Sequence, residues 1–224
     1  MHYFHSNKPI FDSAEYAARL IRQQLYAGKR VLWLLSGGSG IKVDVAAAKL
    51  LAGTDNLSNL IVSLTDERYG KQGHADENWR ELLEAGFVLT GAKLYRPLRA
   101  TDKLSTLDAY DAWMKKQFAA ADYVIGIFGI GSDGHTAGIK PNSDATSAAG
   151  YTTHFEGDDY ERMTITYQAI NKMDAAIIQA SGVDKRATLQ QLLDKSLPLA
   201  DMPAQILHKV PDVSLYTDCE LTQN

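Results

Sequence analysis

The segment YVIGIFGIGSDGHTAGIKPNS, residues 123–143, decides the fold and the place of the candidate site. It opens with an apolar run, Tyr123 to Phe128, that is too short for an independent helix and rich in β-branched and aromatic residues. Such a run is typical of a strand buried on both faces, as in a parallel sheet. Three glycines then surround an acidic residue and a histidine: Gly129, Gly131, Gly134, Asp133 and His135. Because open α/β sheets bind ligands just beyond the carboxyl ends of their strands, we expect this pair to lie in the functional site.

The composition indicates a cytosolic protein with one hydrophobic core. The chain has 224 residues, of which 45% are hydrophobic, and we expect residues 1–224 to form one domain. No segment approaches the roughly 18 consecutive apolar residues of a membrane span, and the first residues lack the pattern of a secretory signal. Cys219 is the only cysteine, which suits a reducing compartment, so a cytoplasmic location is expected. A net charge of -4 argues against a nucleic-acid partner.

Outward from the central strand, buried strand patterns alternate with helical ones. Strands are predicted at Val31–Leu35, Leu60–Leu64, Tyr123–Phe128, Arg162–Tyr167, Ala175–Ala180 and Val213–Tyr216, with weaker candidates at Leu94–Leu98 and Tyr151–Phe155. Helices are predicted at Asp12–Tyr26, about Ile41–Leu51, Glu77–Ala85, Leu104–Ala120 and Val183–Asp194, with a helical turn at Ala204–Lys209. This alternation predicts an α/β fold: a single doubly wound, mostly parallel, Rossmann-like sheet with helices on both faces.

Two details of the helices are also predicted. Asp12 or Ser13 is expected to cap the first helix. In Leu104–Ala120, a buried face is expected from Leu107, Tyr110, Ala112, Met114 and Phe118.

Four of the predicted strands end in polar sequence. These ends are Ser36–Gly40, Thr65–Arg68, Gly129–His135 and Ser181–Lys185. Since the carboxyl ends of parallel strands share one edge of the sheet, we expect the four loops to meet.

Several residues of these loops are candidates for anion binding. Gly37, Gly38 and Ser39 offer consecutive backbone N–H groups at the mouth of a helix, although a plain glycine-rich turn would look similar. Lys185 opens a helix, where a cation is unfavourable unless an anion lies nearby. Arg162 heads a strand and could clamp the same anion, or it could simply flank the strand.

The candidates for catalysis are His135 as a general acid and base and Asp133 as the carboxylate that orients it. Asp66 and Arg68 follow another strand and either face the site or form a local ion pair with Glu67. We expect no metal site, because no clustered histidine and cysteine spacing accompanies His135. We expect no bound nicotinamide either, because the GxGxxG pattern at Gly129–Gly134 is not followed at once by a good helix.

These loops resemble those of the 6-phosphogluconolactonase family. GIGSDGHTAGIKP looks like the GDGHTASLFP signature of that family, and LSGGSG resembles its first phosphate loop. SLTDERYG, DENWR, RMTITY, SGVDK and MPAQIL resemble further family elements in the same order, from about Ser36 to Leu207.

The resemblance implies hydrolysis of 6-phospho-D-glucono-1,5-lactone in the oxidative pentose phosphate pathway, without cofactor or metal. It implies that His135 acts on water and that Asp133 holds its imidazole. It further implies roles for the remaining candidates: backbone N–H groups near Gly37, Gly38 or Gly131 for the oxyanion, Ser39, Arg162 and Lys185 for the phosphate, and Asp66 and Arg68 for sugar hydroxyls or the loop itself. The partner is then a small phosphorylated sugar lactone, with no membrane partner, and the protein is a monomer or a small homo-oligomer.

Two alternatives stay open. The superfamily includes glucosamine-6-phosphate deaminases, whose motif resembles DGHIAFNEP, but Ile139 and Lys140 stand here in place of its asparagine and glutamate. A non-catalytic sugar-phosphate sensor would keep Arg162 and Lys185 yet need neither Asp133 nor His135. The chain also departs from the usual lactonase residues at Gly40, Ile41, Glu77 and Lys140.

Overall fold

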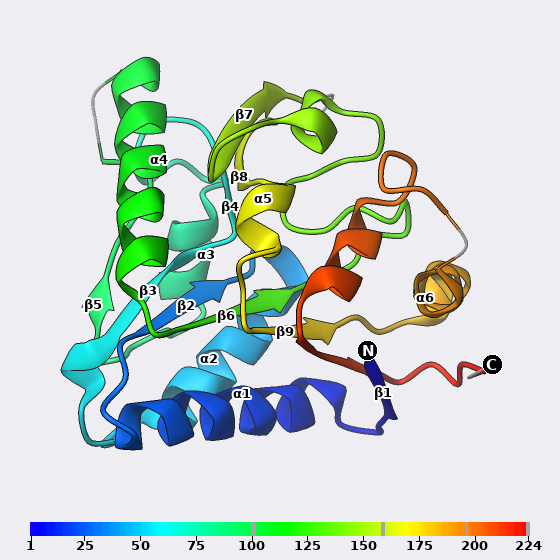
Figure 1. Cartoon of the computed structure of the whole chain (residues 1–224), viewed down its shortest axis with the longest axis horizontal. Coiled ribbons are helices and arrows are strands. Elements are labelled where there is room, and N and C mark those ends of the chain that lie inside the picture. The colour runs from blue at the N-terminus through cyan, green and yellow to red at the C-terminus, as the bar shows by residue number, and fades with distance from the viewer. Residues whose placement is uncertain (100–101, 158–159, 196, 223–224) are drawn as a thin grey trace.

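A central parallel sheet organises the molecule (Figure 1). The computed structural model describes residues 1–99, 102–157, 160–195 and 197–222. The sheet has seven strands in the order β1-β10-β9-β6-β2-β3-β5. Their bounds are His2–His5 (β1), Val31–Leu35 (β2), Leu60–Leu64 (β3), Lys93–Leu94 (β5), Tyr123–Phe128 (β6), Ala175–Gln179 (β9) and Asp212–Thr217 (β10). Each neighbouring pair among these described strands is parallel.

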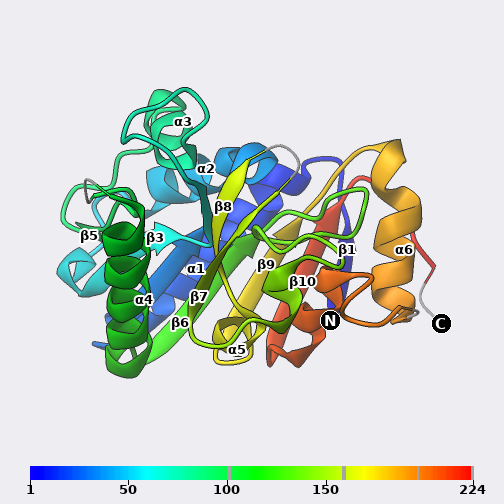
Figure 2. The same cartoon turned by 90° about the horizontal axis from the view of Figure 1, so that it is seen from above.

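Helices cover both faces of this sheet, as Figures 1 and 2 show. The side chains of β2 alternate between two buried clusters: Trp33 faces the first, and Leu32 and Leu34 face the second. The first cluster includes side chains of α1 (Pro9–Tyr26), α2 (Ile41–Leu51) and α3 (Asn78–Glu84). The second includes side chains of α4 (Lys103–Ala120), α5 (Tyr167–Ile170), α6 (Arg186–Asp194) and the 3₁₀ segment Pro203–Lys209. The predicted doubly wound α/β fold is confirmed.

One feature of the predicted sheet differs, because three strands form a second, antiparallel sheet. It consists of β4 (Asp66–Arg68), β8 (Glu161–Ile165) and β7 (Thr152–Glu156), in that order. The chain changes partner at Thr65: its N–H donates to Leu35 O at 2.7 Å, while its carbonyl accepts from Ile165 N at 2.9 Å. The residues after β3 therefore leave the main sheet and pair with β8 above it.

The N-terminal segment is more ordered than its sequence suggests. The first four residues after Met1 form the edge strand β1, which the sequence pattern did not predict. Helix α1 begins at Pro9, three residues before the predicted start, because proline is pre-organised for the first helical position. The predicted caps Asp12 and Ser13 are therefore wrong and lie inside the helix.

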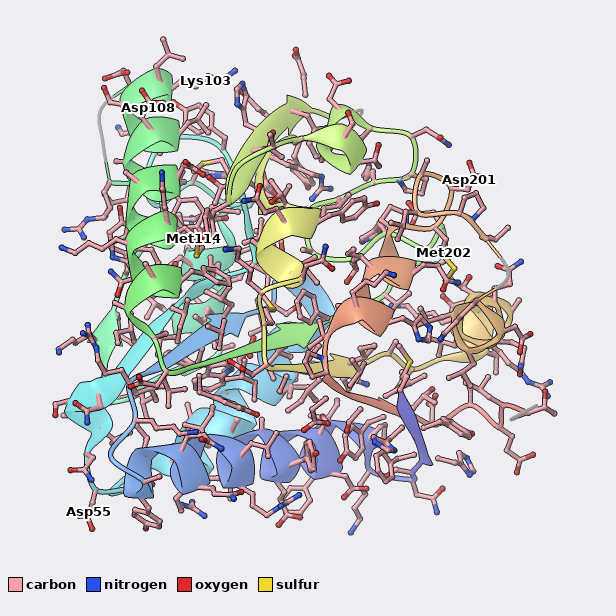
Figure 3. All side chains as sticks on the ribbon, viewed as in Figure 1. Asp55, Lys103, Asp108, Met114, Asp201 and Met202 are labelled. Atoms are coloured by element: carbon pink, nitrogen blue, oxygen red, sulfur yellow. The ribbon has the colours of Figure 1, made fainter. Side chains whose placement is uncertain are left out.

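Other boundaries shift where local chemistry overrides the apolar pattern. Strand β5 stops at Leu94, well before Pro97, and β8 stops at Ile165. The Thr166 hydroxyl accepts from Ala169 N and so starts α5, which contains Tyr167. In α4, Tyr110 and Met114 are buried, and Figure 3 shows Met114 on the side of the helix toward the sheet. Ala112 is exposed, contrary to prediction.

No helix in the described part of the chain combines the length and the apolar character that a bilayer crossing requires.

Candidate active site

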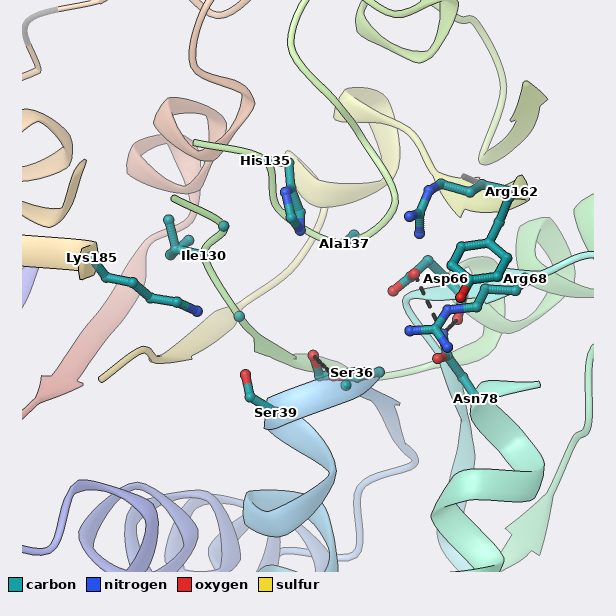
Figure 4. Close-up of a pocket in the computed structure, with 15 residues that line it drawn as sticks. Ser36, Ser39, Asp66, Arg68, Asn78, Ile130, His135, Ala137, Arg162 and Lys185 are labelled. Atoms are coloured by element: carbon teal, nitrogen blue, oxygen red, sulfur yellow. Dashed lines mark hydrogen bonds between the residues drawn. The ribbon is translucent and has the colours of Figure 1, made fainter. Parts of the chain in front are cut away.

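The four polar strand ends meet at one edge of the sheet. Strands β9, β6, β2 and β3 are consecutive in the strand order, so their carboxyl ends lie side by side. Over them lies a pocket of about 250 Å³ (Figure 4). Nine of the ten predicted site residues line it: Gly37, Gly38, Ser39, Asp66, Arg68, Gly131, His135, Arg162 and Lys185. The tenth, Asp133, contacts His135.

His135 and Asp133 form a close pair. His135 Nδ1 lies 2.6 Å from Asp133 Oδ1, which also accepts the backbone N–H of His135 at 3.1 Å. The hydrogen bond with the imidazole is the main cause that lowers the pKa of Asp133 to about 2. An ionised carboxylate only accepts, so Nδ1 donates, and in the neutral imidazole Nε2 then carries the lone pair that can take a proton. Figure 4 shows the His135 ring at the pocket.

A tight turn supports this pair. Gly134 has φ +83°, which glycine adopts without strain. The N–H of Gly131 donates to His135 O at 3.0 Å. This bond uses the Gly131 donor, so the prediction that it receives an oxyanion is not favoured by the geometry.

The loop after β2 is shaped as an anion cradle. A 3₁₀ turn, Gly38–Gly40, leads directly into α2. Among the described residues, the N–H groups of Gly37, Gly38 and Ser39 have no protein acceptor. A hydrogen bond to α2 holds the start of this loop, because Ser36 N donates to the buried carboxyl group of Asp44 at 3.0 Å. These donors can therefore serve a ligand without loss of structure.

Cationic side chains enter the pocket from two sides. Figure 4 shows Lys185 on one side and Arg68 and Arg162 on the other. Lys185 immediately precedes α6. The Nη1 atom of Arg68 contacts Glu81 Oε1 at 3.0 Å and Asp76 O at 3.2 Å, so Arg68 also holds the loop that precedes α3.

Asp66 is a buried carboxyl group within this pocket. Burial raises its pKa, and the positive charge of Arg162, the Thr65 hydroxyl, His135 and Arg68 oppose that effect. Thr65 Oγ1 donates to Asp66 Oδ1 at 3.1 Å. Asn78 Nδ2 donates to Asp66 O at 3.1 Å. Of the two alternatives that the sequence left open for Asp66, the structure supports the first, because Asp66 is buried and lines the pocket.

The sequence reasoning did not assign Tyr160 to the site. Tyr160 lines the pocket, and both Arg68 and Arg162 lie over its ring, with Cζ 4.8 Å and 5.6 Å from the ring centroid. Its position two residues before Arg162 was a usable signal, because alternate residues of an extended segment share a face. Further lining residues are Ser36, Asn78, Gly129, Ile130 and Ala137.

The departures from the usual lactonase sequence do not line the pocket. Glu77 is buried and forms an ion pair with Arg96. Lys140 lies in a separate surface depression. Gly40 packs so closely on Ser36 that an added Cβ would lie 2.5 Å from Ser36 Cβ. Within the described residues, no group of three or more His, Cys, Asp or Glu side chains could hold a metal ion.

A family model described as glucosamine-6-phosphate isomerases/6-phosphogluconolactonase matches residues 8–215. The chain belongs to this family. The match includes every predicted site residue, from Gly37 to Lys185.

Curated relatives in this family carry two kinds of name. A 6-phosphogluconolactonase from Helicobacter pylori (strain J99) is 28% identical over 159 residues, which is 66% of each chain, so the match spans about two thirds of that protein. A probable 6-phosphogluconolactonase from Arabidopsis thaliana is 24% identical over 88% of this chain and 82% of that protein. A glucosamine-6-phosphate deaminase from Staphylococcus aureus (strain RF122) is 33% identical over 110 residues, 43% of each chain.

Solved structures share the fold over nearly the whole chain. A 6-phosphogluconolactonase from Plasmodium vivax has a TM-score of 0.80 at 21% identity and covers 99% of this chain and 91% of that one. The enzyme from Shewanella baltica has a TM-score of 0.79 at 18% identity, with coverage of 96% and 95%. A monomeric glucosamine-6-phosphate deaminase has a TM-score of 0.76 at 20% identity, with coverage of 97% of each chain.

Proposed function

We propose that this protein hydrolyses 6-phospho-D-glucono-1,5-lactone to 6-phosphogluconate, a step of the oxidative pentose phosphate pathway, in the cytoplasm. The observation that carries the proposal is the His135–Asp133 pair, which stands in a pocket that also holds cationic side chains and unused backbone N–H groups. The lactonase names of two curated relatives, whose matches cover 66% and 88% of this chain, support it.

The proposed mechanism needs no covalent nucleophile, because a δ-lactone is already electrophilic. Nε2 of His135 takes a proton from water while the water oxygen bonds to C1 of the lactone. The carbonyl oxygen becomes an oxyanion. When it collapses, the bond between C1 and the ring oxygen breaks, and His135 returns the proton to that oxygen. Asp133 holds the imidazole and balances its transient positive charge.

Binding would use the rest of the pocket. In this proposal the N–H groups of Gly37 and Gly38 receive an anionic oxygen, whether phosphate or oxyanion, and their lack of a protein acceptor among the described residues supports that role. Lys185, Ser39 and Arg162 anchor the phosphate, which holds C1 against the water.

In this proposal Asp66 accepts from sugar hydroxyls, and Arg68 contacts sugar hydroxyls or holds the loop before α3 through Asp76 O. The resulting ligand is a small phosphorylated sugar, bound by a monomer or a small homo-oligomer without a cofactor.

A second candidate is glucosamine-6-phosphate deamination, which the Staphylococcus aureus match favours. That match covers only 43% of the chain. Lys140 stands where the deaminase motif has its glutamate, and a cation cannot act as that acid–base group. The lactonase is therefore the better proposal.

The test compares wild type with His135→Ala on freshly generated 6-phosphogluconolactone, after subtraction of spontaneous hydrolysis, with glucosamine 6-phosphate assayed in parallel. Wild type should accelerate hydrolysis, and His135→Ala should lose about 10²–10⁴-fold in kcat while it still binds 6-phosphogluconate. Ammonia release from the amino sugar without lactone hydrolysis would establish the deaminase instead. If wild type neither hydrolysed the lactone nor released ammonia but still bound 6-phosphogluconate, the protein would be a sugar-phosphate sensor.

A further inference from the structure

The two arginines of the pocket face each other across a strand pair. In the antiparallel pairing of β4 and β8, Arg68 stands directly opposite Arg162. Like charges at directly opposite positions destabilise such a pair. Both nevertheless line the pocket, and Figure 4 shows them on the same side of it, beside Asp66. Glu81, which pairs with Arg68, and Asp66, which lies near both arginines, offset part of this repulsion, but the two guanidinium groups still require a shared element that orients them.

The aromatic ring of Tyr160 meets this requirement. The Cζ atoms of Arg68 and Arg162 lie 4.8 Å and 5.6 Å from its centroid, both within the range of a cation–π interaction. The backbone of Tyr160 is held by its carbonyl, which accepts from Gly157 N at 3.0 Å, and its ring is held by the hydroxyl, which donates to Asp76 Oδ1 at 3.4 Å.

We propose that Tyr160 is a positioning residue whose ring holds Arg68 and Arg162 together as one anion-binding unit, on the side of the pocket opposite Lys185. The identity of the anion, a group of a phosphorylated sugar acid or its lactone, rests on the proposed function. Tyr160 does not touch the reacting atoms in this scheme. Its loss reduces affinity because the two guanidinium groups separate when no shared ring orients them.

The experiment uses two ring-free variants, Tyr160→Leu and Tyr160→Gln, and one that keeps the ring, Tyr160→Phe. Tyr151→Leu is the matched control, because Tyr151 carries a similar contact, with Lys172 Nζ 5.5 Å from its centroid, next to the same small sheet but outside the pocket lining. The Kd of 6-phosphogluconate is measured by calorimetry, and kcat and KM are measured on the lactone.

The ring-free variants should raise Kd and KM about tenfold and leave kcat nearly unchanged, since His135 and Asp133 are intact. Tyr160→Phe should recover most of the affinity, and Tyr151→Leu should bind as wild type does. A double-mutant cycle adds a second readout. Tyr160→Leu should cost little further affinity when Arg162 is already replaced by alanine, and clearly more in a Lys185→Ala background, where both arginines are still present.

The proposal would be overturned if both ring-free variants bound 6-phosphogluconate as tightly as wild type. It would also be overturned if the affinity losses of Tyr160→Leu and Arg162→Ala simply multiplied in the double variant, or if wild type did not bind 6-phosphogluconate at all. The proposed function fails separately. If wild type does not hydrolyse the lactone, but binding falls without the ring and returns with phenylalanine, the role of Tyr160 stands and the lactonase proposal does not.

Discussion

At the residue scale, the His135–Asp133 pair depends on a position that has no side chain. A Cβ on Gly131 would lie 2.1 Å from His135 Nδ1 and 2.4 Å from Asp133 Oδ1, far inside van der Waals contact. Gly131→Ala must therefore displace the pair. We expect kcat to fall at least about tenfold with a smaller change in KM, because misplaced acid–base groups lose most of their effect.

Gly129→Ala is the matched control for that prediction. A Cβ there would meet only Ser39 Oγ at 3.9 Å and Ser36 Oγ at 4.0 Å, which is ordinary contact. Steady-state kinetics of the two variants should differ clearly in kcat. Equal kcat values would show that His135 does not need its present position.

Lys185 is the residue whose role separates phosphate binding from chemistry. Lys185→Ala should raise KM for the phosphorylated lactone about 10- to 100-fold, because one charge-assisted contact is lost. It should change hydrolysis of unphosphorylated glucono-1,5-lactone little. The exposed Lys49→Ala provides the comparison for a general change in net charge. An equal loss on both lactones would contradict a phosphate anchor.

At the element scale, the loop between β4 and α3 is held by a buried ion pair. Glu77 is fully buried and makes a two-point contact with Arg96, and it also accepts from Gly73 N at 2.5 Å. Arg96→Met would leave this carboxylate buried without its cation. We expect the free energy of unfolding, measured in urea, to fall by about 3 kcal/mol.

A second substitution tests the reason for that loss. Adding Glu77→Gln to Arg96→Met removes the stranded charge and should recover much of the stability. The exposed pair Arg80–Glu84 is the control, and Arg80→Met should change stability little. If the double variant were no more stable than Arg96→Met alone, a buried charge would not be the cause.

Sequence patterns found most elements because buried strands and amphipathic helices leave local signals. The runs at Val31–Leu35, Leu60–Leu64 and Tyr123–Phe128 coincide with β2, β3 and β6. The small sheet was assigned to the main one because partner choice is not local: Thr65 bonds to Leu35 on one side and to Ile165 on the other. Strand β1 was missed because three of its four residues are exposed, which leaves no apolar pattern.

At the scale of the whole molecule, the site follows from strand order. The polar ends of β2, β3, β6 and β9 could be gathered from the sequence because parallel strands share a carboxyl edge. The proximity of Tyr160 to Arg162 in the sequence was a signal for the pocket, but its contact with Arg68 could not be predicted, since the register between β4 and β8 brings Arg68 opposite Arg162 from far along the chain. Gly131 was predicted and lines the pocket, but the use of its N–H within a turn could not be predicted.

Folding also places carboxyl groups where burial opposes ionisation. Burial raises the pKa of Asp44 and Asp66 and raises that of Glu67 to about 8, although Glu67 accepts from Asn78 N at 2.7 Å and Trp79 N at 3.0 Å. Between the ordinary value of 4.5 and about 8, folded Glu67 holds a proton that the unfolded chain has lost. Stability must therefore fall as pH rises through this range. Asp133 has the opposite effect, because its pKa is lowered on folding. Its contribution to the stability of the folded state is present above pH 3.8 and is lost as the pH falls toward about 2.

Glu67→Gln isolates this effect, because glutamine cannot ionise. The free energy of unfolding of wild type, measured in urea at pH 5, 6, 7 and 8, should fall by a few kcal/mol across the series. The free energy of unfolding of Glu67→Gln should fall less over the same range. The difference in stability between the variant and wild type should therefore shift steadily toward the variant as the pH rises. The exposed Glu84→Gln should keep the wild-type slope. Parallel slopes for wild type and Glu67→Gln would mean that Glu67 is already ionised at pH 5, held by the N–H groups at the start of α3 more strongly than burial opposes it.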